Sequence, residues 1–194
     1  MDIKKISKLN IIQTDWSGGS SRQYYIYPEF SNFIDEDFDF RISSALVEVK
    51  ESVFTNFPNH ERILMIIEGE MKISHKGFYE KELKQFDQDQ FLGKLTTTAS
   101  SKGVVVDFNV IFSEKYNAIC KYLTIDLFEE FEVYNQWLFI YLVKGDLSVE
   151  VGEESFHLEE LEMLMVKADD KVMIKLKNYS SSECIVTQIK KTEI

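Results

Sequence analysis

The chain has 194 residues, of which 22 are Lys or Arg and 33 are Asp or Glu, so its formal net charge is −11 at pH 7. A chain of this length forms one domain or two fused halves, and it can bury a core without needing disulfides. The acidic balance argues against nucleic acid as a partner, and the lack of an apolar run of about 18 residues argues against a membrane.

Cysteine usage and the N-terminus indicate the compartment. Cys120 and Cys184 are far apart in the sequence and neither belongs to a CxxC pair, so we expect free thiols in apolar strands. The first residues contain only fragments of an apolar stretch and no small-residue cleavage site, unlike a secretory signal. A reducing compartment, and therefore a cytoplasmic location, is expected.

Apolar and polar residues alternate along most of the chain, which is the pattern of β-strands. Only Asp126–Phe131 and Glu159–Met163 look locally helical, and the second segment also fits a turn. The sequence therefore predicts an all-β protein built as a sandwich or barrel. The expected strands, in chain order, are Tyr24–Tyr27, Phe40–Lys50, Arg62–Glu68, Met71–Ser74, Val104–Phe112, Ala118–Asp126, Leu138–Val143, Leu147–Val151, Ser155–Leu158, Leu164–Lys167, Val172–Lys177 and Cys184–Lys190.

One pattern occurs twice. Arg62–Ile73 and Leu138–Val149 each contain a mostly apolar run, a charge, a glycine, an acid and then alternation. Gly69 and Gly145 stand where a hairpin would need a positive φ, and the two copies suggest an internal duplication. The pattern is similar to that of cupin barrels. We therefore expect a bicupin-like double-stranded β-helix (jelly-roll) protein, with one half over residues 1–127 and the other over 128–194, packed as one compact unit.

Cupin enzymes hold a metal with two histidines at HxH spacing, a nearby Glu and a third histidine from a later strand. This chain has three histidines, His60, His75 and His157, and they are spread too widely for that spacing. Arg62 and Leu138 stand where the metal-binding Glu of each half would fall, and neither side chain can ligate a metal. We expect no metal and no cofactor.

The first half carries polar residues at strand positions. Arg41 and Ser43 share one face of a strand, and Asp107 and Asn109 share one face of another. Arg62 opens a strand that is otherwise apolar. A buried arginine must be paired or must meet an anion. Two interpretations stay open, namely an Arg62–Asp107 or Arg41–Asp107 pair that locks the barrel, or a pocket that binds an anion such as a carboxylate.

Seven motif-like segments follow one another along the chain, namely Trp16–Ser20, Tyr27–Pro28, Phe38–Ala45, Val53–Arg62, the Gly69 turn, Phe91–Gly93 and Gly103–Val110. Together they resemble the HutD/Ves family, whose pattern runs W-x-G-G-T, P, F-x-W-R-I-S-x-A, F-S-x-F-P-G-x-D-R, a Gly turn, F-x-G and D-F-N-V. This sequence departs from that pattern at Phe40, Asn59 and Glu61, where the family has Trp, Gly and Asp. The resemblance implies a bicupin-like protein with a ligand-binding or regulatory role in histidine breakdown, or a stress-associated role in other bacteria. It implies no established enzymatic activity.

The leading hypothesis is a metal-free protein that binds a small anionic metabolite through its carboxylate. Two arginines would hold the carboxylate, a serine and an asparagine would add hydrogen bonds, an aspartate would orient one arginine, and two aromatic residues would close the mouth. The predicted site residues are Arg41, Ser43, Arg62, Asp107, Asn109, Trp16 and Phe57.

Two other hypotheses stay open. A metal-independent isomerase or hydrolase acting on a small acid would use Asp107 or the His60–Glu61 pair as its general base. An interaction protein without a ligand would use the arginines only to lock the barrel. His75 is expected in a solvated turn and His157 on an exposed strand face. Because such barrels often pair through their edge strands, a homodimer is a further hypothesis.

Overall fold

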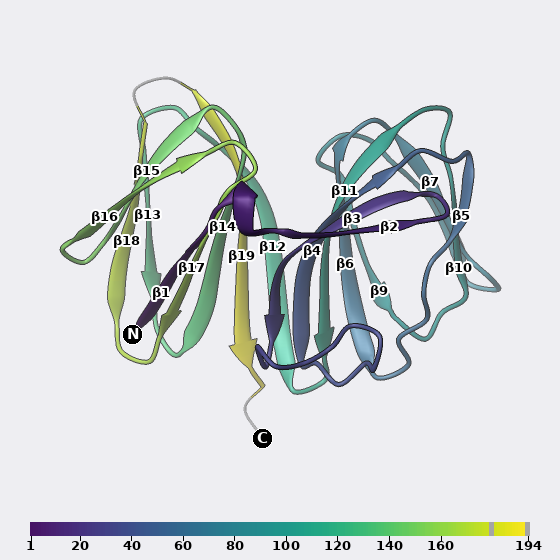
Figure 1. The fold of residues 1–194 in the computed structure, drawn as a ribbon, viewed down its shortest axis with the longest axis horizontal. Coiled ribbons are helices and arrows are strands. Elements are labelled where there is room, and N and C mark those ends of the chain that lie inside the picture. The colour runs from purple at the N-terminus through teal and green to yellow at the C-terminus, as the bar shows by residue number, and fades with distance from the viewer. Residues whose placement is uncertain (179–180, 193–194) are drawn as a thin grey trace. The chain divides into compact units, whose positions relative to one another are not determined.

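The computed structural model describes residues 1–178 and 181–192. Within these residues the chain forms strands β1 to β19 and one short 3-10 helix, η1 (Lys8–Asn10), which confirms an all-β protein (Figure 1). Each expected strand overlaps an observed one. The segment Asp126–Phe131, expected to be locally helical, instead enters strand β13, and Glu159–Met163 forms a turn between two strands.

The strands divide into two compact units, which are described separately. One unit is Ile12–Tyr116, and the other joins Met1–Ile11 to the chain from Asn117 onward. The predicted division instead kept residues 1–127 together. The N-terminal residues belong to the second unit because strand β1 (Asp2–Ile6) pairs with β17 (Met163–Ala168), with Asp2 opposite Lys167 and Ile6 opposite Met163. The sequence contains no signal for a pairing this distant.

The first unit contains a six-stranded sheet in the order β2-β3-β4-β11-β6-β9 and a four-stranded sheet in the order β5-β10-β7-β8 (Figure 1). Apolar residues from both sheets, including Leu64, Ile66 and Ile73, form its core. Its strands are β2 (Ile12–Trp16), β3 (Gly19–Tyr27), β4 (Phe40–Val47), β5 (Glu51–Val53), β6 (His60–Glu68), β7 (Met71–His75), β8 (Tyr79–Leu83), β9 (Gln88–Leu92), β10 (Thr97–Ser100) and β11 (Val105–Ser113).

The second unit contains a five-stranded sheet in the order β1-β17-β14-β19-β12 and a four-stranded sheet in the order β13-β18-β15-β16. Its core again draws on both sheets, with Leu138, Ile140 and Val149 among its fully buried members. Cys120 and Cys184 are free, buried thiols in this unit, as expected. The remaining strands are β12 (Tyr116–Ile125), β13 (Phe128–Val133), β14 (Gln136–Lys144), β15 (Asp146–Val151), β16 (Glu154–Glu159), β18 (Val172–Lys177) and β19 (Ser182–Lys191).

The two units repeat one topology. The order β4-β11-β6-β9 in the first unit corresponds to β12-β19-β14-β17 in the second, and β5-β10-β7-β8 corresponds to β13-β18-β15-β16. Gly69 and Gly145 occupy equivalent turns with φ of 85° and 89°. These turns are not hairpins, because the strands on either side of each glycine belong to different sheets. The predicted duplication is therefore present, and its glycines mark the places where the chain passes between sheets.

Seven strands gave no sequence signal that we recognised, and most of them are short and exposed. All residues of β2 are exposed, and only Leu83 of β8 is buried. Such strands are held by backbone pairing to a neighbour and do not need apolar alternation. The strands missed are β1, β2, β5, β8, β9, β10 and β13.

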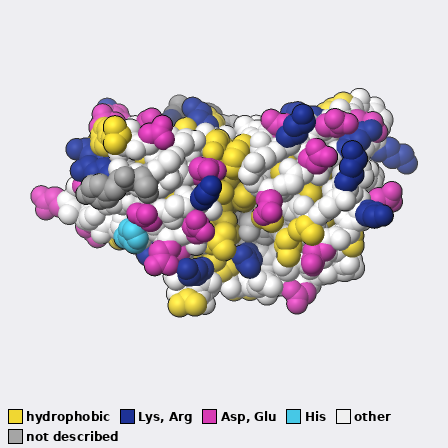
Figure 2. Space-filling view, turned by 90° about the horizontal axis from the view of Figure 1, so that it is seen from above, with side chains coloured by type: hydrophobic (Ala, Val, Ile, Leu, Met, Phe, Trp, Pro, Cys, Tyr) yellow, Lys and Arg dark blue, Asp and Glu magenta, His cyan; other side chains and the backbone are white. Residues whose placement is uncertain are grey.

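Acidic and basic side chains are interspersed on the molecular face drawn in Figure 2. Exposed ion pairs occur in both units, such as Lys8 with Glu159 and Lys72 with Glu80. Exposed pairs of this kind contribute little to stability. In the part of the chain that the structure describes, no helix has the length and apolar character needed to cross a membrane.

Candidate functional site

Strand register places two arginines on one face of the six-stranded sheet. β11 lies between β4 and β6, and Ile111 is opposite Arg41 on one side and Arg62 on the other. Directly opposed residues on neighbouring strands point to the same face of a sheet. The two arginine side chains therefore lie on the same face, separated by one strand.

The next rows along β11 extend this polar face. Asn109 is opposite Ser43, and Asp107 is opposite Ala45. On the far side of β4, Gln23 of β3 is opposite Ser43. Alternation along each strand thus brings the polar residues that sequence analysis singled out to one surface inside the first unit.

A cavity of about 680 Å³ opens over this face. Its buried base consists of residues that we call the floor: Arg41, Ser43, Arg62, Asp107 and Asn109. Trp16 lines the cavity as well, so the structure brings six of the predicted residues together. Phe57 does not line it. Its side chain is 1% exposed and packs behind Phe33, with ring centroids 5.4 Å apart. Phe57 is therefore part of the core and does not close the mouth.

Arg41 is held in place by neutral groups. Its Nε donates to Gln23 Oε1 at 2.8 Å, and its Nη1 donates to Ser43 Oγ at 2.8 Å. The guanidinium also stacks on the Phe33 ring, with 4.1 Å from Cζ to the ring centroid. These contacts fix the orientation of the guanidinium and leave its charge uncompensated.

Arg62 is even less satisfied. Its guanidinium lies 4.7 Å from the centroid of the Phe54 ring, and its buried Nε has no hydrogen-bond partner. Within residues 1–178 and 181–192, neither Arg41 nor Arg62 has a carboxylate within the 4.0 Å of an ion pair. The barrel-locking pair with Asp107 that sequence analysis left open is therefore not formed.

Burial shifts the pKa values of all three charged groups in the floor. Burial lowers the pKa of Arg41 to about 10, with a further contribution from the positive charge of Arg62. It also lowers the pKa of Arg62 to about 10, against the opposing effect of Asp107. Burial raises the pKa of Asp107 to about 7, although the Arg62 charge acts in the opposite direction. Both arginines remain cationic at neutral pH, and Asp107 is poised to change its protonation state there.

Asn109 leaves an acceptor free in the same floor. Its Nδ2 donates to Asp107 Oδ1, whereas its buried Oδ1 has no partner. The floor therefore offers two cations that need an anion and one amide oxygen that needs a donor. Planar guanidinium groups suit carboxylates, so a small acid carrying an N–H or O–H group would satisfy this set.

The histidines lie outside the cavity. His60 Nε2 donates to the carbonyl oxygen of Phe38 at 2.9 Å, while Glu61 accepts a hydrogen bond from Gln90, so His60 and Glu61 do not form a proton-transfer pair. His157 is exposed, as expected. The structure describes no group of three His, Cys, Asp or Glu side chains that could hold a metal, so the residues present do not fit a cupin metal centre.

The prediction for His75 was wrong. Its ring is 1% exposed, packs against Tyr79 and Phe91, and lies 2.8 Å from Thr97 Oγ1 and 3.1 Å from an oxygen of Asp89. The signal was present in the sequence, because Met71, Ile73 and His75 alternate along β7 and share its buried face.

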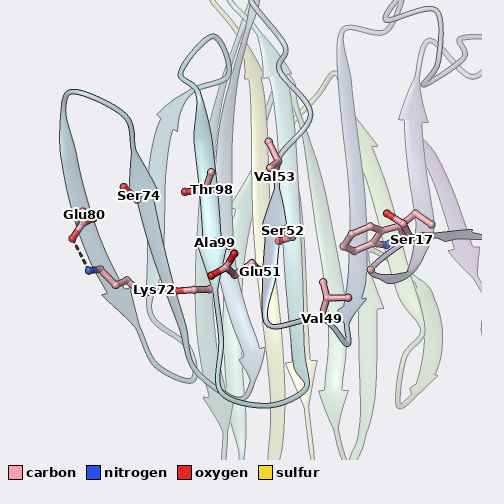
Figure 3. A pocket seen from close by; sticks show the side chains of 13 residues that line it. Ser17, Val49, Glu51, Ser52, Val53, Lys72, Ser74, Glu80, Thr98 and Ala99 are labelled. Carbon is pink, nitrogen blue, oxygen red and sulfur yellow. Dashed lines mark ion pairs between the residues drawn. The ribbon is translucent and has the colours of Figure 1, made fainter.

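A second concavity, of about 820 Å³, lies on the solvent-facing side of the four-stranded sheet (Figure 3). Figure 3 shows Lys72 and Glu80 pointing toward each other, with Ser74 and Thr98 nearby and Ser17 and Val49 farther along the groove. The charges here are exposed and Lys72 is already paired with Glu80. Because nothing buried is left unsatisfied, this groove is a weaker candidate than the cavity over the floor.

Two jelly-roll units of the same topology, with a buried cationic floor in the first, define a bicupin-type protein without the cupin metal ligands. The HutD family model matches residues 9–184, and the chain belongs to the HutD family. This confirms the HutD resemblance that the sequence motifs indicated. No match was found among curated protein sequences.

Solved structures share the fold. A conserved protein of unknown function from Pseudomonas aeruginosa PAO1 aligns with a TM-score of 0.88 at 16% identity, covering 99% of this chain and 100% of that one. HutD from Pseudomonas fluorescens SBW25 aligns with a TM-score of 0.80 at 20% identity, with the same coverage. Oxalate decarboxylase from Lactobacillus farciminis, in a formate complex, aligns with a TM-score of 0.72 at 8% identity over 98% of this chain and 86% of that one. These similarities establish the bicupin fold.

Proposed function

We propose that this HutD-family protein binds a small carboxylate in the cavity of its first unit and acts as a ligand-binding regulator of histidine breakdown in the cytoplasm. One observation carries the proposal. Arg41 and Arg62 are both buried, both face one cavity, and neither has an ion-pair partner among the described residues. Buried charges without partners are costly, so a protein retains them where an anion arrives to satisfy them.

The remaining floor residues support a carboxylate over other anions. Arg41 is already oriented by Gln23 and Ser43, and the unpartnered Asn109 Oδ1 can accept a hydrogen bond from a neutral part of the ligand. Each guanidinium can bind a carboxylate through two parallel N–H···O bonds, and the negative charge that Asp107 acquires near neutral pH disfavours a dianion such as phosphate. The HutD structure from P. fluorescens was obtained in a formate condition, and formate is the simplest carboxylate.

The role in histidine breakdown and the cytoplasmic location rest on the family. Membership of the HutD family supports a ligand from the histidine pathway, such as urocanate or formylglutamate. Two free, buried cysteines are compatible with a reducing compartment.

Calorimetric titration of the full chain with formate, acetate, urocanate, formiminoglutamate and formylglutamate tests the proposal. At least one acid should bind, and Arg62→Gln or Arg41→Gln should weaken its binding at least tenfold, because each removes one charge-assisted contact. Arg22→Gln is the matched control, since Arg22 is on the same sheet and does not line the cavity. Equal binding by wild type and Arg62→Gln, or no binding by any acid, would overturn the proposal.

A second function, catalysis on the bound acid, is favoured by Asp107 alone. Its carboxyl group lies in the floor with a pKa raised by burial to about 7, a value suited to a general base at neutral pH. This function predicts turnover of the bound acid by wild type and loss of that turnover in Asp107→Asn while the acid still binds. Binding without chemical change by wild type would exclude catalysis on that acid.

A further inference from the structure

Large apolar side chains that line the same cavity remain exposed at its mouth. Phe30 is 89% exposed, Ile34 is 83% exposed and Val53 is 73% exposed, yet each lines the cavity. Isolated apolar residues on a surface need no explanation, whereas a group around one opening marks a binding surface. The residues that we call the apolar mouth are Ile12, Trp16, Phe30, Ile34 and Val53.

The cavity therefore changes character with depth. The floor residues are all buried and include two positively charged arginines, whereas the mouth residues are exposed and carry no charge. Two half-buried aromatic rings line the cavity beside the floor, where Phe33 stacks on Arg41 and Phe54 stacks on Arg62. The exposed lining also includes the neutral polar residues Thr14, Asn32 and Thr55, so the entrance is uncharged and largely apolar, whereas the guanidinium groups lie at the base.

The volume of the cavity exceeds the need of a carboxylate alone. Its 680 Å³ lies within the range of pockets that enclose drug-sized molecules. Formate or acetate bound to the floor would leave the mouth residues in water. A ligand that satisfies the whole cavity must also cover apolar surface.

We propose that the natural ligand is an amphipathic carboxylic acid, whose carboxylate lies between Arg41 and Arg62 and whose alkyl or aryl body covers the apolar mouth. This inference rests on the proposed carboxylate site and adds the chemical class of the rest of the ligand. Of the two acids named for that site, it favours urocanate, whose aromatic ring can cover the mouth, over formylglutamate, whose second carboxylate would lie among apolar side chains. Burial of apolar surface at the mouth supplies affinity, and the arginines supply orientation.

A protein partner would suit the mouth less well. Closing the cavity with a protein surface that does not reach the floor would remove the remaining water from Arg41 and Arg62 and leave both charges without an anion. One small molecule with a charged end and an apolar end meets both requirements.

A chain-length series tests the inference. Acetate, butyrate, hexanoate, octanoate and phenylacetate are titrated into the full chain, with calorimetry and the quenching of Trp16 fluorescence as readouts. Affinity should rise about fourfold for each added methylene until the body of the acid fills the mouth. Octanamide, which has the chain without the charge, should bind far more weakly than octanoate. Glutarate and adipate, whose second carboxylate would lie in the apolar mouth, should gain nothing from their length.

Variants of the apolar mouth measure the contribution of the ligand's apolar body to affinity separately from that of its carboxylate. The double variant Phe30→Ser/Ile34→Ser changes two exposed side chains and should fold normally. It should bind acetate as wild type does and lose most of the gain from acetate to octanoate. Phe78→Ser is the matched control, because Phe78 is 71% exposed in the same unit and does not line the cavity. The fluorescence change reports on this cavity, because Trp16 lines it and the other tryptophan, Trp137, lies outside this unit.

The outcomes distinguish this inference from the function on which it rests. If acetate binds through Arg62 and longer acids bind no better, the carboxylate site stands and the amphipathic ligand is rejected. If no acid binds, both fail. If sedimentation shows a dimer that Phe30→Ser/Ile34→Ser dissociates, and hexanoate binds no better than acetate, a second copy covers the mouth and the inference is overturned.

Discussion

Arg41 and Arg62 flank the same residue of β11, and the positive charge of Arg62 adds to burial in lowering the pKa of Arg41. Two positive charges that lie one strand apart repel each other, and their burial destabilises the unit that contains them. Neutral hydrogen-bond acceptors and aromatic rings hold them in place without removing the charge. An anion bound between the two guanidinium groups would therefore stabilise this floor.

Arg62→Met should separate binding from stability. The variant keeps an apolar chain beside Phe54 and removes a buried charge that has no ion-pair partner in the described structure. We expect its free energy of unfolding without ligand to stay within about 1 kcal/mol of wild type or to rise, while carboxylate binding is lost. Urea denaturation measures the first quantity and calorimetry the second. A loss of several kcal/mol would instead show that Arg62 locks the barrel and would favour an interaction protein without a ligand.

Asp107 should make carboxylate binding depend on pH. Its pKa of about 7 means that the folded protein carries a neutral Asp107 below that pH and a negative one above it. A negative Asp107 beside Arg62 repels an incoming carboxylate and competes for the guanidinium. Affinity should therefore fall as the pH rises through about 7, and it should stay flat over that range in Asp107→Asn. A pH-independent affinity in wild type would contradict this role.

The same group should make stability depend on pH. The unfolded chain releases the Asp107 proton near its ordinary pKa of 3.8, whereas the folded chain keeps it up to about pH 7. Between these values the folded state binds more protons, so the contribution of Asp107 to the free energy of unfolding falls as the pH rises. Urea denaturation at pH 5 and pH 8 measures this effect. The free energy of unfolding of wild type, relative to that of Asp107→Asn, should be lower at pH 8 than at pH 5. A difference between the two proteins that does not change with pH would argue against the raised pKa.

Alternation within single strands was the part of the site that sequence could predict. Arg41 with Ser43, and Asp107 with Asn109, were expected to share faces, and the register shows that they do. Which strands lie side by side could not be predicted, because pairing partners come from distant parts of the chain. Only the structure shows that Ile111 separates the two arginines and that Asp107 forms no ion pair with either.

Some site residues were misplaced or missed for the same reason, because their positions depend on contacts between distant parts of the chain. Phe57 precedes Pro58 in a segment without alternation, so nothing indicated that it packs behind Phe33. Phe30 and Ile34 lie in the loop between β3 and β4, where apolar residues have no periodic meaning. Loops carry binding residues on a rigid scaffold, and their contribution to a site appears only once that scaffold is folded.

Two glycines with nearly the same φ allow a steric contribution to stability to be measured. Gly69 has φ of 85° and Gly77 has φ of 82°. A Cβ at Gly69 would lie 2.7 Å from the carbonyl oxygen of Val104, whereas a Cβ at Gly77 would have nothing within 4 Å. Gly77→Ala should cost about 1 kcal/mol for the conformation alone. Gly69→Ala should cost about 1–3 kcal/mol more, because the backbone must move to admit the methyl group. Equal costs in urea denaturation would show that the turn between β6 and β7 adjusts freely.

The buried carboxylate of Asp89 should be important for the stability of the first unit. It accepts hydrogen bonds from Tyr79 Oη at 2.8 Å and Lys81 Nζ at 3.0 Å, and it lies 3.1 Å from His75 Nε2. Asp89→Asn keeps the shape of the side chain, removes its charge and turns one acceptor into a donor that faces these donors. We expect a loss of about 1–3 kcal/mol in the free energy of unfolding. Glu80→Gln, which removes the exposed partner of Lys72 on the neighbouring strand, is the control and should leave the melting temperature almost unchanged. If Asp89→Asn unfolds at the same urea concentration as wild type, the charged hydrogen bonds of Asp89 do not contribute to the free energy of unfolding.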